Sequence, residues 1–132
     1  MRTIIRTSSQ RHTQVRREVF HALTWQVRPG TWSPPTDMYE TEMEYLVRLE
    51  VAGMQEEDFE VSVESNVLFV AGVRHDVPER RAYHQMEIRF GKFNVSIGLP
   101  GPVDVDAARA EYIQGFLTIF LPRPRTLHVS AD

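Results

Sequence analysis

The chain of 132 residues contains no cysteine. This absence excludes disulfides, thiolate metal sites and cysteine nucleophiles, and it suits a reducing, cytoplasmic location. The sequence also lacks any run of about eighteen apolar residues, so we expect no membrane-spanning segment and no membrane association. With 42% hydrophobic and 25% charged residues, the composition is that of a soluble globular protein with room for one hydrophobic core.

Signatures of catalysis are equally scarce. The sequence has neither a glycine-rich phosphate loop nor a nucleophile elbow. Its five histidines are scattered and show no ligand spacing on any expected element. His75 beside Asp76 allows a metal site in principle, but a solvated loop explains the pair better. We therefore expect no enzyme, no catalytic residues, no cofactor and no bound metal.

Charge is unevenly distributed along the chain. Residues 1–31 carry six arginines and a single acid, Glu18, so they have a net charge of +5 and the remaining residues carry −8. A basic arm of this kind attracts an acidic partner or the acidic body of a neighbouring subunit. A transit peptide has a similar composition, but no cleavage signal follows here. Nucleic-acid binding is not expected, because the first nineteen residues contain no aromatic side chain for stacking.

Apolar residues within the arm recur at helical spacing before Pro29-Gly30 ends the pattern. The stretch is too short to form a stable helix alone in water. Its apolar face is therefore expected to be buried against another chain. The residues on this face are Val15, Val19, Phe20, Leu23 and Val27.

After Trp32 the period of the apolar residues changes to two, which is typical of half-buried β-strands. Glu44–Val51 and Phe59–Val63 alternate cleanly between apolar and polar side chains. Val67–Val73 is apolar on both faces, as expected for a central strand, and Ser65-Asn66 before it is short enough for a hairpin turn.

The second half of the chain continues the β pattern. Residues 74–84 are polar and predict a loop with a short strand near Ala82–His84. Met86, Ile88 and Phe90 alternate again, and Gly91-Lys92 is expected to turn the chain into the next strand. Further strands are expected at Phe93–Leu99, Ala110–Ile113 and Phe116–Leu121, with one helical turn at Val105–Arg109. Seven to eight short strands predict an all-β, immunoglobulin-like antiparallel sandwich.

Three motifs follow one another in the second half of the sequence: Gly91-Lys92-Phe93, Leu99-Pro100 and Ala110–Pro122. They resemble the G-x-F, L-P and A-x-x-x-(N)-G-(V/I)-L-x-I-x-(L/V)-P pattern of the small heat shock proteins, the α-crystallin domain family, in its bacterial and archaeal form. Gln114 departs from the usual Asn and Phe116 from the usual Val or Ile, which affects the last turn. Further matches upstream are Trp32-Ser33-Pro34, Asp37, Tyr45–Gly53, Leu68–Gly72, and Tyr83-His84 with Glu87 and Arg89.

The resemblance implies three parts: an arm at 1–31, partly helical, an α-crystallin sandwich at 32–122, and a C-terminal extension at 123–132. It implies an ATP-independent holdase of the stress response, which binds partly unfolded client proteins and prevents their aggregation. The homo-oligomer would be built from dimers that exchange a strand in the long loop. The implied dimer-interface residues are Trp32, Asp37, Tyr39, Ala82, Tyr83, His84 and Arg89.

The two ends of the chain take further roles by the same resemblance. Leu127 and Val129 would form a tail anchor that docks in a groove of a neighbouring dimer. The groove residues would be Phe59, Val61, Val63, Val95 and Ile97, and the client-binding residues of the arm would be Val19, Phe20, Leu23 and Trp25. A monomeric adaptor of the related CS-domain co-chaperone type remains the alternative, although that group lacks both the long loop and the tail anchor.

Overall fold

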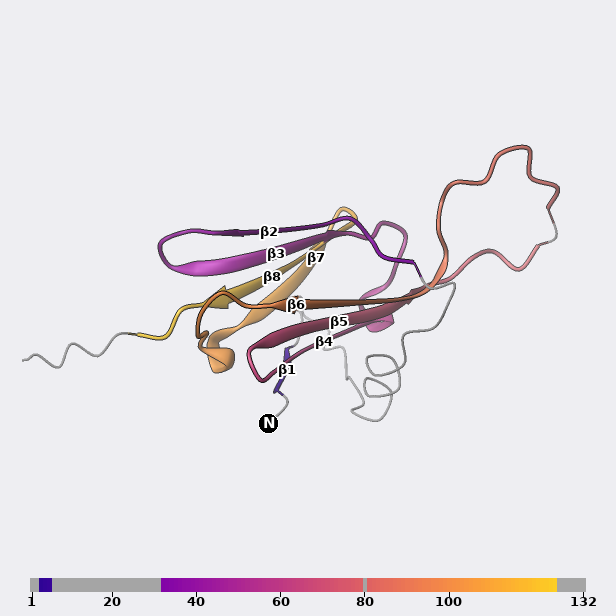
Figure 1. Ribbon diagram of the computed structural model, residues 1–132. Coiled ribbons are helices and arrows are strands. Elements are labelled where there is room, and N and C mark those ends of the chain that lie inside the picture. The colour runs from indigo at the N-terminus through magenta and orange to yellow at the C-terminus, as the bar shows by residue number, and fades with distance from the viewer. Residues whose placement is uncertain (1–2, 6–31, 80, 126–132) are drawn as a thin grey trace, which may run out of the picture.

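The computed structural model describes residues 3–5, 32–79 and 81–125. Two four-stranded antiparallel sheets pack face to face (Figure 1), so the predicted all-β sandwich is confirmed. The first sheet has the order β1-β4-β5-β6 and the second β2-β3-β8-β7. The strands are β1 Thr3–Ile5, β2 Thr36–Glu40, β3 Glu44–Glu50, β4 Phe59–Glu64, β5 Val67–Arg74, β6 Gly91–Gly98, β7 Arg109–Ile113 and β8 Phe116–Pro122. Two short 3-10 turns, Glu56–Asp58 and Val105–Ala107, complete the described elements.

The core lies between the sheets and follows the alternation read from the sequence. Val47 and Leu49 of β3 are fully buried and pair with Ile119 and Leu117 of β8. Across the sandwich, Val70 at the centre of β5 is equally buried. Because side chains of a strand alternate between faces, one buried row on each strand is enough to close the interior.

Two hairpins use two-residue turns in which both residues have positive φ. These are Ser65-Asn66, at 53° and 62°, and Gln114-Gly115, at 51° and 85°. Such turns match the twist of the strands that they join. Gln114 thus takes the left-handed conformation that Asn tolerates more readily, and the departure from the family pattern leaves the hairpin intact.

Trp32 closes the end of the core next to β6. Its ring is 7% exposed and meets Phe93 edge-on with centroids 5.4 Å apart. Its indole N–H donates to the carbonyl of Gly91 at 3.0 Å. Trp32 was predicted to lie at the dimer interface, but the ring contact and the hydrogen bond hold it mostly buried within its own chain.

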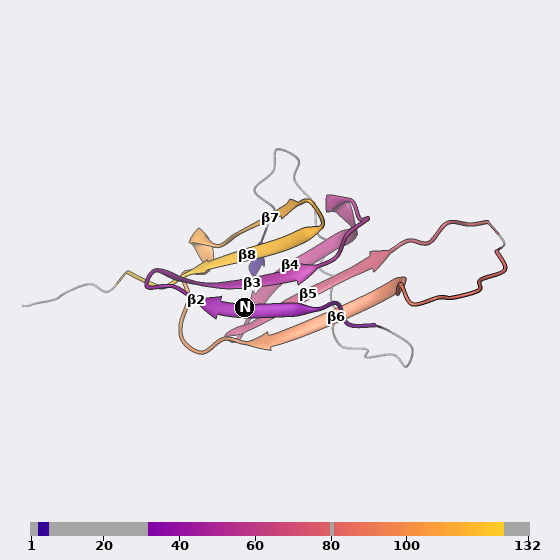
Figure 2. The same ribbon diagram turned by 90° about the horizontal axis from the view of Figure 1, so that it is seen from above.

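The expected strands before Gly91 do not form. Among the described residues between Arg74 and Gly91 there is no strand, and β6 begins at Gly91 rather than after a turn. This segment, residues 75–90, projects beyond the sandwich in both views (Figures 1 and 2), and we call it the excursion. A strand needs a neighbour for its N–H and C=O groups, and none of the described strands lies beside this segment. Met86 and Ile88 do alternate with polar residues, but no described segment pairs with them.

Candidate functional site

The excursion exposes apolar side chains at the end of the molecule. Tyr83 is 46% exposed, Met86 60% and Ile88 66%. Close by, Arg81 pairs with Glu79 at 3.0 Å, and this hydrogen bond raises the pKa of the guanidinium. Large apolar side chains in a cluster on a loop mark an interaction surface more often than isolated ones do.

A free strand edge lies in the second sheet. β2 pairs with β3 on one side, and no described strand pairs with its other side. Tyr39 on this strand is 47% exposed, and Asp37 stands opposite Arg48 in the register with β3. An unpaired edge presents a row of backbone donors and acceptors that another extended segment can bind. Of the predicted interface residues, the structure thus brings Asp37 and Tyr39 to this edge and leaves Ala82, Tyr83, His84 and Arg89 on the excursion.

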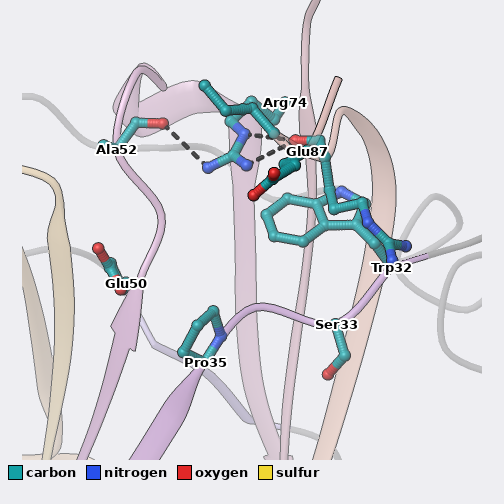
Figure 3. Close-up of a pocket in the computed structure, with 9 residues that line it drawn as sticks. Trp32, Ser33, Pro35, Glu50, Ala52, Arg74 and Glu87 are labelled. Atoms are coloured by element: carbon teal, nitrogen blue, oxygen red, sulfur yellow. Dashed lines mark hydrogen bonds between the residues drawn. The ribbon is translucent and has the colours of Figure 1, made fainter. Parts of the chain in front are cut away.

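At the root of the excursion lies an open cavity of about 700 Å³, lined by residues before β2, after β3 and on the returning limb of the loop. Arg74, the last residue of β5, is among the residues that line it (Figure 3), and its guanidinium lies near both the carbonyl of Ala52 and the ring of Trp32. The sequence predicts Arg74 only as the first residue of a polar loop. Its place directly after the apolar run Val67–Val73 was the one available signal.

The five predicted groove residues do not share one edge, and this part of the prediction is wrong. Phe59, Val61 and Val63 lie on β4 and are at most 3% exposed, whereas the half-buried Val95 and Ile97 lie on β6. β5 separates the two strands in the sheet, so no edge groove can include both.

The edge of the sandwich at β4 instead faces β7. The rings of Phe59 on β4 and Tyr112 on β7 lie with their centroids 4.9 Å apart. β4 pairs with β5 on one side and with β1 on the other, in the register Thr3↔Val63 to Ile5↔Val61. No strand was expected in the arm. It forms because the edge of β4 provides the hydrogen-bonding partners that three residues cannot provide for themselves.

The outer face of the second sheet carries two stacked arginine–aromatic pairs. The guanidinium carbon of Arg48 lies 3.9 Å from the ring centroid of Phe116, and that of Arg109 lies 3.9 Å from Phe120. An arginine over an aromatic face is attracted by the ring and also covers it. This accounts for Phe116, which departs from the family pattern: its ring lies on the outer face beneath an arginine, where a branched aliphatic side chain would offer no comparable platform.

The remaining predicted residues lie outside the described part of the chain. These are Val19, Phe20, Leu23 and Trp25 of the arm, and Leu127 and Val129 of the tail. Within the described residues, no group of three or more histidines and acids is placed to hold a metal ion. None of the helices described has the length and apolarity needed to cross a membrane.

The sequence of this chain is similar to a known protein family and to several of its members. Residues 37–130 match the model of the Hsp20/alpha crystallin family. Small heat shock protein C4 of Rickettsia felis is 33% identical over 93 residues, which cover 69% of this chain and 57% of that protein. Heat shock protein 16 of Schizosaccharomyces pombe is 33% identical over 99 residues, covering 72% and 69%. The chain spans 57% and 60% of the two Rickettsia felis proteins that it matches.

Solved structures agree with the sequence matches. Heat shock protein 16.0 from Schizosaccharomyces pombe aligns with a TM-score of 0.65 at 27% identity, covering 79% of this chain and 76% of that one. A small heat-shock protein from Xylella fastidiosa, described as having a distinct high order structure, aligns with a TM-score of 0.64 at 26% identity, covering 76% and 99%. The arrangement of the two sheets is therefore shared with these proteins.

Proposed function

Because the chain belongs to the Hsp20/alpha crystallin family, we propose that it is an ATP-independent chaperone of the stress response that holds partly unfolded proteins and prevents their aggregation. The proposal includes assembly from strand-exchanged dimers and a cytoplasmic location. No catalytic step is part of it. The observation that carries it is the coexistence, in one chain, of an unpaired β2 edge and an unpaired extended loop with exposed apolar side chains.

Strand exchange between two copies would satisfy both features together. The excursion of one protomer, around Tyr83, would add to β2 of its partner, and the two-fold axis would repeat the contact. Each protomer would lose one exposed edge and cover part of its apolar loop. The projection of the excursion away from its own sandwich supports exchange between chains over pairing within one chain.

The two ends of the chain complete the proposal. Leu127 and Val129 in the extended tail would face the same side and anchor on a neighbouring dimer. The receiving groove of this proposal is the β4 edge opposite β7, since β5 separates β4 from β6. The tail would there take the place of β1, which pairs with the same edge. The arm residues Val19 and Phe20, with Leu23 and Trp25, would supply apolar contacts that are individually weak and collectively strong, which suits capture of many unfolded chains.

The test measures mass and activity on the same preparation of the full chain. Native mass spectrometry reports the assembly, and light scattering follows the heat aggregation of citrate synthase without nucleotide. We expect assemblies of even subunit number and suppressed scattering at about one subunit per client. Bovine serum albumin at equal mass serves as the control. A monomer that leaves scattering unchanged would instead favour a monomeric adaptor of the CS-domain type.

A further inference from the structure

The guanidinium of Arg74, at the end of β5, contacts three other segments at the root of the excursion. Its Nε and Nη2 both donate to the carbonyl of Arg89, at 2.8 and 2.5 Å, on the returning limb of the loop. Its Nη1 approaches the carbonyl of Ala52 after β3 at 3.4 Å. Its carbon lies 4.2 Å from the ring of Trp32 before β2, and 5.5 Å from that of Phe90. We call this set of contacts the Arg74 clamp.

The clamp is the main attachment of the excursion to the sandwich. Among the described residues, the other hydrogen bonds made within 76–90 are local, such as Arg81 to Glu79 and Gln85 to Glu87. The one further link at the root is His75, which lies 3.4 Å from Asp58 and joins the outgoing limb. Among the described residues, the hydrogen bonds between the sandwich and the returning limb, which leads from Tyr83 to β6, therefore all come from Arg74.

The geometry needs an arginine at this position. Two parallel N–H groups on one carbonyl fix the plane of the guanidinium, and that plane then lies over the indole of Trp32. Lysine carries the same charge, but its ammonium can neither present this fork nor stack as a plane. Trp32 is itself fixed by its hydrogen bond to Gly91, so the platform beneath the clamp is rigid.

We infer that Arg74 is the positioning residue that fixes the direction in which the excursion leaves the sandwich, and that it thereby sets the stability of the dimer. The second half of the inference rests on the proposed strand exchange, whereas the first half does not. A loop held in its binding direction loses less conformational entropy on association than a loop that is free to swing. Arg74 thus acts on the interface without belonging to the exchanged strand.

The first test measures the mobility of the returning limb. Because the chain contains no cysteine, Gln85→Cys creates a single site for a spin label on the full protein. We expect the label to move faster in Arg74→Lys and Arg74→Ala than in the wild-type background. The matched control is Arg109→Lys, which also removes a guanidinium from an aromatic ring, but on β7 at the far side of the sheet from β2. Equal mobility in all four proteins would overturn the clamp.

The second test measures exchange between dimers. Isotopically heavy and light full chains are mixed, and native mass spectrometry follows the appearance of assemblies with an odd number of heavy subunits, which form only when dimers come apart. Loss of hydrogen bonds from a charged donor leads us to expect exchange about tenfold faster in Arg74→Lys, with Arg109→Lys unchanged. Circular dichroism should report the same sandwich in all variants. Faster label motion without faster exchange would overturn the link to the dimer. A wild-type chain that forms no dimer would refute the proposed strand exchange, and the label would still decide whether the clamp exists.

Discussion

The hydroxyl group of Tyr112 on β7 donates a hydrogen bond of 2.7 Å to the main-chain carbonyl of Val51. The same oxygen accepts a hydrogen bond of 3.2 Å from the backbone N–H of Met54. The chain leaves β3 at Val51 and crosses to the first sheet past Met54, so one side chain of the second sheet holds the crossing. The ring of Tyr112 meanwhile contacts Phe59, the first residue of β4.

Removing this hydroxyl tests how much the crossing contributes to stability. Tyr112→Phe should lower the free energy of unfolding by about 1–3 kcal/mol, because the buried carbonyl of Val51 and the N–H of Met54 both lose a partner. Urea denaturation measures the change. Ser96→Ala, which removes a hydroxyl from an exposed position of β6, is the control and should stay within about 0.5 kcal/mol of the wild type. An equal loss in the two variants would contradict the role of the hydroxyl.

The core strand β8 offers a second test of stability. Leu117 is fully buried and pairs with Leu49 of β3 and Tyr112 of β7. Leu117→Ala should lower the free energy of unfolding by about 2–5 kcal/mol through lost contacts and the cavity left behind. Thr118→Ala, next along the strand on the outer face, should cost much less. Urea denaturation should therefore give a lower midpoint for Leu117→Ala than for Thr118→Ala. The reverse order would contradict the placement of Leu117 in the core and Thr118 on the outer face of β8.

The free edge of β2 can be tested at one backbone N–H. The N–H of Glu50 donates to the carbonyl of Pro35, and the N–H of Thr41 donates to the carbonyl of Glu44, so both are hydrogen-bonded pairs of the antiparallel ladder. In the alternation of such a ladder, the N–H of Met38 then points away from β3, towards the free edge. Met38→Pro should therefore remove a donor needed for strand addition and shift the protein towards monomers.

The side chain of Met38 also packs against the core, so a second variant is needed. Met38→Ala loses that packing but keeps the N–H, so it should be less stable while keeping the assembly of the wild type. Sedimentation velocity of the three proteins gives the comparison. Dimers that persist in Met38→Pro, with the fold intact by circular dichroism, would show that strand addition does not take place at β2.

The tail prediction concerns assembly beyond the dimer. Truncation after Pro124 removes Leu127 and Val129 and should leave mainly dimers in native mass spectrometry. The full-length double variant Leu127→Ser and Val129→Ser should behave in the same way, because the anchor depends on the two apolar side chains and not on the length of the tail. Large assemblies that persist in both proteins would exclude the tail anchor.

Local pattern predicted most of the fold. The alternation in Glu44–Glu50 and Phe116–Pro122 identified two strands and their buried faces, because burial on one side of a sheet leaves a period of two in the sequence. The turns at Ser65-Asn66 and Gln114-Gly115 were also predicted, since short loops with few conformations are encoded locally. The pattern failed at Met86 and Ile88, where the alternation is present but none of the strands that the structure describes is a neighbour.

What the tertiary structure alone decided is which strands share an edge. The sequence places Phe59 and Val95 on strands with similar faces, and it contains nothing that says β5 lies between them. It shows Arg74 at a strand end, but not the carbonyl of Arg89 and the ring of Trp32 that meet there from 15 and 42 residues away. The period of the apolar residues shows which side chains face the core, because each buried position favours an apolar residue independently of the others. Strand order and long-range contacts depend on how whole elements pack, and that information is spread over the entire chain.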